Sequence, residues 1–131
     1  MDDEREVEYL DVEDLIALAT TLLGKPPPIR DVGLLGSAAA RPQTSVSGED
    51  AYPDIWRKAA ALLQSILKNH ALVDGNKRLG WLSTAVFLEL NGVVVTATSN
   101  DDVYALVMDI AAEDRTLPEI AAVLRRLLSG P

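Results

Sequence analysis

The sequence predicts an all-α protein, a compact bundle of about six helices with at most a short β pair. Two observations predict this class. Apolar residues recur at spacings of three and four along most of the 131 residues, the period of helices with one face in a core. Cap and turn residues also divide the chain into segments of helical length. We expect the whole chain, residues 1–131, to form one domain, with the acidic residues 1–6 as a frayed terminus.

Six segments have the features of helices. Asp11 can cap the first, Asn100 can cap the fifth, and Thr116 with Glu119 forms a capping box at the start of the last. The fourth helix is apolar around most of its circumference, which predicts that it lies at the centre of the bundle. The predicted helices span about 12–23, 31–41, 53–69, 76–90, 101–113 and 116–128.

The remaining segments are predicted to be extended or irregular. Residues 7–10 are a short extended candidate. Prolines 26–28 force an extended connector, because each ring fixes φ and removes a hydrogen-bond donor. Residues 42–50 lack periodicity and are rich in turn formers, so we expect a mobile loop there. The β-branched run 93–98 predicts a short strand or extended segment.

Composition excludes several kinds of site. The chain has no cysteine, so disulfides, thiolate zinc sites and cysteine nucleophiles are excluded, and its single histidine excludes any site that needs two. Apolar runs fall far short of the roughly 20 residues that span a bilayer. The acidic start is unlike the basic start of a signal peptide. We therefore expect a cytoplasmic protein with no membrane contact.

Charge is unevenly distributed along the chain. The formal net charge is -8, and residues 1–14 alone carry eight acidic residues against one arginine. Residues 57–78 carry five basic residues, with Asp74 as their only acid. An acidic protein with one basic segment is a poor general binder of nucleic acid, and we expect no direct DNA binding. The basic segment suits a small anion such as a nucleotide.

Polar and charged residues are concentrated in residues 70–78, His-Ala-Leu-Val-Asp-Gly-Asn-Lys-Arg, between two apolar helices. Gly75 allows a tight turn and a close approach of a ligand to the backbone. The free N–H groups that open the next helix, together with the positive end of its dipole, form an anion site for which phosphate is the natural ligand. Lys77 and Arg78 are unfavourable in the first turn of a helix unless an anion is present, which again indicates phosphate.

Two further residues complete a site for group transfer. A carboxylate at Asp74 would repel a neighbouring phosphate unless a cation lay between them, and Mg²⁺ binds one or two carboxylates together with phosphate oxygens. His70 belongs to the residue type that exchanges protons near neutral pH, and it can take a proton from an incoming hydroxyl. A base, a metal and an anion site together indicate transfer of a phosphate-containing group.

This segment resembles the motif of the Fic/Doc superfamily, His-x-Phe-x-[Asp/Asn/Glu]-[Ala/Gly]-Asn-[Lys/Gly]-Arg. The lysine after the asparagine is the Doc (death-on-curing) form. The resemblance covers about residues 7–128 and includes the helix before the motif, the Asn-Gly after the central helix and the Arg-Arg-Leu-Leu near the C-terminus. It implies a Fic/Doc-like bundle whose central helix follows the motif loop.

The resemblance implies a role for each matching position. His70 would be the base that activates a target hydroxyl, and Asp74 would hold Mg²⁺. Arg78 would neutralise the transferring or leaving phosphate. Contacts to phosphate are implied for Lys68, Gly75, Asn76, Lys77 and Arg78.

Three positions depart from the common Fic pattern. Leu72 replaces the usual phenylalanine and keeps an apolar anchor under the loop. Lys77 replaces a glycine and Trp81 replaces a second arginine, and adenylyl-transferring members use that glycine and arginine to turn the α-phosphate toward the histidine. Both changes favour the Doc orientation, in which the γ-phosphate of ATP faces the histidine.

The resemblance therefore implies a Doc-like toxin of a toxin–antitoxin pair. It would be a Ser/Thr protein kinase that uses ATP and Mg²⁺, modifies elongation factor Tu and arrests translation. Two alternatives remain open: an adenylyltransferase of the Fic type, and a degenerate Fic-fold protein that only binds a partner or nucleotide.

An outside inhibitor is also expected. Self-inhibited Fic proteins carry a segment [Ser/Thr]-x-x-x-Glu-[Gly/Asn]. The nearest string here, residues 45–50, ends in Asp50 and contains Gly48, which disfavours a helix. We interpret it as a flap beside the active site. Doc-like proteins are neutralised by a Phd-like antitoxin, whose disordered tail would fold on binding as an amphipathic helix in a groove.

Overall fold

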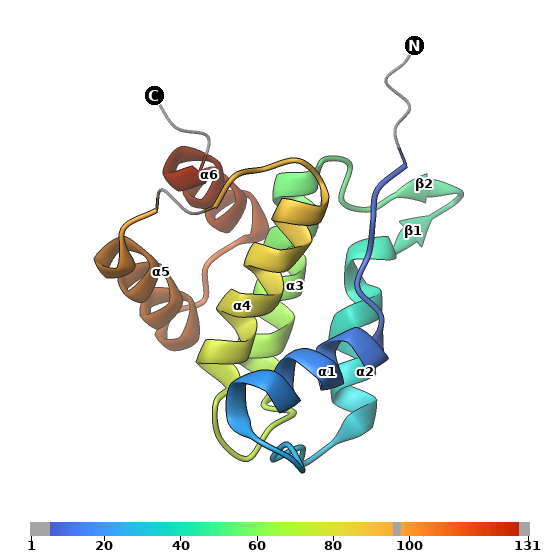
Figure 1. Ribbon diagram of the computed structural model, residues 1–131. Coiled ribbons are helices and arrows are strands. Elements are labelled where there is room, and N and C mark those ends of the chain that lie inside the picture. Colours follow the sequence, from blue (N-terminus) through green and yellow to red (C-terminus); the bar gives the residue numbers. More distant parts are fainter. Residues whose placement is uncertain (1–5, 96–97, 129–131) are drawn as a thin grey trace.

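The computed structural model describes residues 6–95 and 98–128. It confirms the all-α class, because helices form the body of the molecule and the sheet of the described residues is one short hairpin (Figure 1). The helices are α1 (Val12–Leu23), α2 (Val32–Ala40), α3 (Ile55–Asn69), α4 (Asn76–Leu90), α5 (Asn100–Ala112) and α6 (Leu117–Leu128). The 3₁₀ turn Arg41–Gln43 and the strands β1 (Ser45–Val46) and β2 (Glu49–Asp50) lie between α2 and α3. The predicted frayed terminus lies almost wholly outside the described residues.

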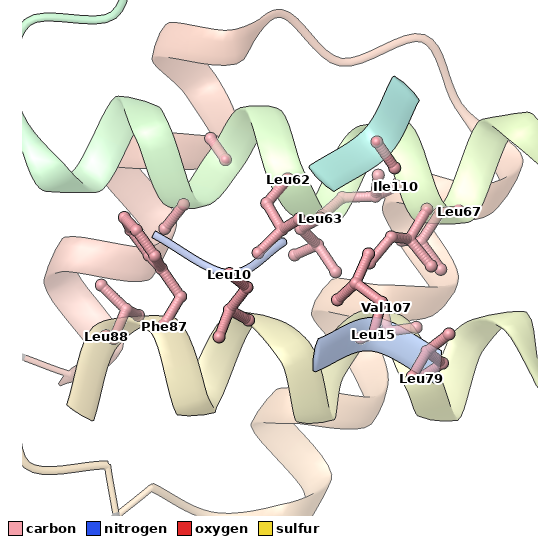
Figure 2. Packing of buried hydrophobic residues seen from close by; sticks show 14 of the residues in the cluster. Leu10, Leu15, Leu62, Leu63, Leu67, Leu79, Phe87, Leu88, Val107 and Ile110 are labelled. Carbon is pink, nitrogen blue, oxygen red and sulfur yellow. The ribbon is translucent and has the colours of Figure 1, made fainter. Parts of the chain in front are cut away.

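α3 and α4 form an antiparallel pair at the centre of the bundle, which confirms the predicted central position of α4 (Figure 1). Gly80 allows the two helices to approach closely, because a Cβ there would lie 3.3 Å from side-chain carbons of Leu63 and Leu67. Figure 2 shows the apolar core between them, to which α1 and α5 also contribute. Its buried members include Leu15, Leu62, Leu63, Leu79, Phe87, Leu88, Val107 and Ile110.

The outer helices flank the central pair on two sides. α1 and α2 lie on one side, and α5 and α6 lie on the other (Figure 1). The loop that joins α3 to α4 therefore emerges at one end of the bundle, close to the C-terminal end of α1 (Figure 1). None of the helices in the described ranges is both long and apolar enough to cross a bilayer.

The predicted helix ends agree with the structure to within about two residues. α3 begins at Ile55 rather than at 53, because the carboxylate of Asp54 accepts from the N–H of Arg57 at 2.8 Å and so caps the helix. Ser99, not Asn100, caps α5. The capping box of Thr116 and Glu119 is confirmed, with bonds of 2.9 and 3.2 Å.

No strand forms in the described part of the range 93–98, which leaves the predicted alternative of an extended segment there. The N–H of Val93 donates to the carbonyl of Leu88, and that of Thr98 donates to the carbonyl of Val95, so neither donor is used for strand pairing. Residues 96–97 lie outside the described residues. A β-branched run forms a strand only when another strand lies beside it, and the described residues provide none for this run.

The predictions for residues 42–50 are wrong in two respects. The segment is not irregular, because it forms the 3₁₀ turn and the hairpin of β1 and β2. Nor does the hairpin lie beside the motif loop. The ammonium of Lys58 donates to Asp50 Oδ2 at 3.0 Å and to the carbonyl of Tyr52 at 2.5 Å. Lys58 precedes His70 by about 18 Å of helix, so the hairpin packs near the opposite end of α3.

Candidate active site

The predicted motif forms the loop between α3 and α4 and the first turn of α4. The proline-rich connector, residues 26–31, runs beside this loop and pairs with it. The N–H of Val73 donates to the carbonyl of Pro28 at 2.8 Å, and the N–H of Arg30 donates to the carbonyl of Ala71 at 2.7 Å. The segment that flanks the motif is therefore this connector, and not the hairpin.

His70 ends α3 in the left-handed conformation, with φ 54° and ψ 49°. Residues other than glycine rarely adopt this conformation, and it is common at functional sites. The imidazole is exposed and has no hydrogen-bond partner among the described residues. Its ring nitrogens are thus available to an incoming hydroxyl, as a general base requires.

Gly75 is the N-cap of α4, with φ 91°. It supplies no side chain to cap the helix, and within the described chain no group accepts from the N–H groups of Asn76, Lys77 and Arg78. The other five helices begin at an Asp, Ser or Thr cap. The first turn of α4 therefore has three unused donors and a positive dipole end, which is an arrangement that binds anions.

The side chain of Asn76 faces the loop. Its Oδ1 accepts from the N–H of Leu72 at 3.1 Å, and its Nδ2 donates to the carbonyl of Leu72 at 3.0 Å. Leu72 is 2 % exposed, so its side chain is the apolar anchor that was predicted for this position. The predicted phosphate contact of Asn76 stays a prediction, and it would use the backbone N–H.

A cavity of about 810 Å³ opens between the motif loop, α4 and α5. The motif lines one part of it, including His70 and Asp74, and apolar side chains of α4 and α5 line the rest. Trp81 lies in the apolar part, together with Tyr104 and Met108, which are 68 % and 38 % exposed. An apolar and aromatic floor next to an anion site suits a nucleoside phosphate.

The α5 residues that line the cavity were not predicted from the sequence. Tyr104 and Met108 are four positions apart, and so lie one turn apart on the same helix face. Large apolar side chains at that spacing, beside a phosphate motif, could have indicated a ligand surface. Directly after Met108, Asp109 accepts two hydrogen bonds from the guanidinium of Arg115, which hold the pKa of that carboxyl below its usual range.

Asp74, Lys77 and Arg78 are exposed, line the same cavity, and have no ion-pair or hydrogen-bond partner within the described residues. No group of three or more metal-ligating side chains occurs in the described ranges. A single carboxylate beside a phosphate site fits Mg²⁺, which keeps several waters and takes its remaining ligands from phosphates. The site therefore fits a magnesium–nucleotide complex.

Lys68 lies outside the cavity that the other predicted site residues line. Its ammonium donates to the carbonyl of Ala111 at 3.3 Å and lies 3.8 Å from Asp114, so it contacts the C-terminal end of α5. It does not line the cavity. The other six predicted site residues all line it.

The sequence also matches known proteins over most of its length. Residues 9–88 match the Fic/DOC family, a range that includes the motif and the connector. The chain is also 49 % identical over 118 residues to the protein "Toxin Doc" of Mycolicibacterium smegmatis (strain ATCC 700084 / mc(2)155). That alignment covers 89 % of this chain and 91 % of the relative.

Proposed function

Because the chain belongs to the Fic/DOC family, we propose that it is a Doc-type toxin that transfers the γ-phosphate of ATP to a Ser or Thr hydroxyl of a protein. The observation that carries this proposal is the first turn of α4. Its N–H groups and the cations Lys77 and Arg78, for which the described ranges hold no partner, line the same cavity as His70. That combination provides an anion site and a base within one loop.

In the proposed reaction His70 is the general base. Its imidazole takes the proton of the target hydroxyl while the hydroxyl oxygen forms a bond to the γ-phosphorus. The bond from that phosphorus to the β–γ bridging oxygen breaks, and ADP leaves. Lys77 and Arg78 stabilise negative charge on the transferring and leaving phosphates. Asp74 would hold Mg²⁺, which neutralises phosphate charge when it is bound.

Two residues support phosphoryl transfer over adenylyl transfer. Trp81 lies in the cavity at the position where adenylyl-transferring Fic enzymes carry a second arginine. It offers a ring for stacking but no charge for an α-phosphate. Lys77 adds a cation where those enzymes have glycine. We therefore place the γ-phosphate at His70 and the nucleoside against the apolar part of the cavity.

We further propose that the target is a translation factor of the elongation factor Tu type, modified in the cytoplasm. The direct test incubates the purified protein with ATP, Mg²⁺ and elongation factor Tu and then measures the intact mass of the factor. A mass gain of one phosphoryl group, absent with His70→Ala, is expected. A gain of one adenylyl group would establish the alternative transferase. No modification of any protein, with intact nucleotide binding, would favour a binding protein.

A Phd-like antitoxin is the proposed inhibitor. Glu49, the residue nearest to an internal inhibitory glutamate, lies in β2 beside Asp50, whose partner is Lys58 and not the motif loop. Expression of the chain alone should arrest bacterial growth, and co-expression of the antitoxin should restore growth. Glu49→Gly should change neither result. Toxicity of Glu49→Gly without toxicity of the wild type would place the inhibitor inside the chain.

A further inference from the structure

We propose that Arg30, which lies outside the motif, is a positioning residue that fixes the peptide of His70 and so the direction of its imidazole. This inference rests on the proposed function, in which His70 is the base. The backbone of the connector bonds to the later part of the motif loop, whereas the Arg30 side chain bonds to His70. The guanidinium of Arg30 donates from Nη2 to the carbonyl of His70.

The backbone of the connector holds only the later part of the loop. Ile29 and Leu72 form an isolated antiparallel bridge, and the N–H groups of both Arg30 and Asp31 donate to the carbonyl of Ala71. None of these backbone bonds reaches His70. The Arg30 side chain is therefore the group through which the connector acts on the base itself.

His70 needs such a contact more than its neighbours do. Its left-handed conformation is unfavourable for a residue with a Cβ, and its imidazole has no partner within the described chain that could orient it. The hydrogen bond from Arg30 fixes the carbonyl that follows its Cα, and thereby its ψ. A base must lie within hydrogen-bond distance of the proton it removes, so a shift of this peptide would misplace it.

Arg30 itself starts from a fixed backbone. Its N–H is bonded to Ala71 at 2.7 Å, and the next residue, Asp31, caps α2 by accepting from the N–H of Leu34 at 3.0 Å. The guanidinium can therefore keep a constant position although the side chain is exposed. A planar guanidinium that is hydrogen-bonded to a carbonyl loses less freedom than an ammonium in the same place.

The chain has a single histidine, so the one Cε1–Hε1 imidazole signal in a ¹H–¹³C NMR spectrum reports on His70 directly. We would record this spectrum for the full chain, for Arg30→Ala and Arg30→Lys, and for Arg57→Ala as the matched control. Arg57 is also an exposed arginine, but it pairs with Asp54 at the opposite end of α3. Arg30→Ala should shift and broaden the imidazole signal, Arg30→Lys should restore much of it, and Arg57→Ala should leave it unchanged.

The rate of phosphoryl transfer is measured on the same proteins. Arg30→Ala should lower kcat by about 10- to 100-fold, the scale of a small misplacement of a reacting group, while the ATP affinity and the melting temperature stay near the wild-type values. If Arg30→Ala does not fold, Arg30→Met is measured in its place, because it keeps the length of the side chain and has no group that can donate to the carbonyl.

An unchanged imidazole signal in Arg30→Ala would overturn the proposal. So would an increase in KM for the protein target with kcat and the signal unchanged, because Arg30 would then be a substrate contact. If the wild-type protein transfers no phosphate, the proposed function fails, and the NMR spectra still decide whether Arg30 orients His70.

Discussion

Asn76 bonds to both backbone groups of Leu72, and Asn91 bonds in the same way to Glu8. Each asparagine accepts from the N–H and donates to the carbonyl of one residue, at 3.0–3.1 Å for Leu72 and 2.9 Å for Glu8. The two asparagines lie at opposite ends of α4. The first fixes the motif loop, and the second fixes the extended segment before α1.

Substitution of Asn76 should therefore affect both stability and function. Asn76→Ala leaves two buried backbone groups of Leu72 unpaired and should lower the free energy of unfolding by about 1–3 kcal/mol. It should also abolish measurable ATP binding, because the loop is no longer held. Asn91→Ala is the control: urea denaturation should show a loss of similar size, and calorimetric titration should show unchanged ATP affinity. Equal ATP affinity in the two variants would contradict the account.

Gly75→Ala should disturb the anion site. A Cβ at Gly75 would lie 2.7 and 2.8 Å from the δ-carbons of Leu23, and the left-handed φ adds strain of roughly 1–2 kcal/mol. We expect a lower melting temperature and weaker ATP binding. Gly48→Ala also carries a positive φ, of 82°, but meets no atom within 4 Å and lies in the hairpin. It should lower stability and leave ATP binding intact.

Trp81 should report nucleotide binding by its fluorescence. The chain has two tryptophans, and of these Trp81 lines the cavity whereas Trp56 does not. ATP should change the emission of Trp56→Phe and leave that of Trp81→Phe unchanged. Trp81→Ala should weaken ATP binding by about threefold to tenfold, the scale of one aromatic contact. A fluorescence change that persists in Trp81→Phe would place the nucleotide elsewhere.

Lys58 should matter for stability and not for chemistry. Its side chain is 1 % exposed, and its ammonium bonds to Asp50 and Tyr52 and lies 5.8 Å from the ring centroid of Tyr9. Lys58→Ala removes these bonds and leaves a cavity, so we expect a loss of about 2–4 kcal/mol in urea denaturation. Lys58→Met keeps the buried methylenes and should lose less. ATP affinity, measured on the folded protein, should not change in either variant.

The helices could be predicted from the sequence because their determinants are local. The spacing of apolar residues and caps such as Asp11 and Thr116 lie within the segments that they define. Six of the candidate site residues could be named for the same reason, since nine consecutive positions carry the motif and the structure places all six along one cavity. Local patterns even indicated the extended connector, because proline restricts its own φ.

Other features depend on residues far apart in the chain. The bond from Arg30 to His70 spans 40 positions, and the residues of α5 in the cavity follow the motif by about 30. No local period encodes these contacts. Residues 45–50 were interpreted as a flap beside the motif because the string departs from an inhibitory segment at Gly48 and Asp50. Their actual position depends on the buried ammonium of Lys58, whose partners could not be read from spacing.

The central claim is that this site transfers the γ-phosphate of ATP with His70 as the base. The most direct measurement incubates the protein and Mg²⁺ with bacterial extract and either γ-labelled or α-labelled ATP, beside His70→Ala as the inactive control. Our account predicts that a protein acquires the γ-label, that no protein acquires the α-label, and that His70→Ala transfers neither. Incorporation of the α-label, or full incorporation of the γ-label by His70→Ala, would contradict it.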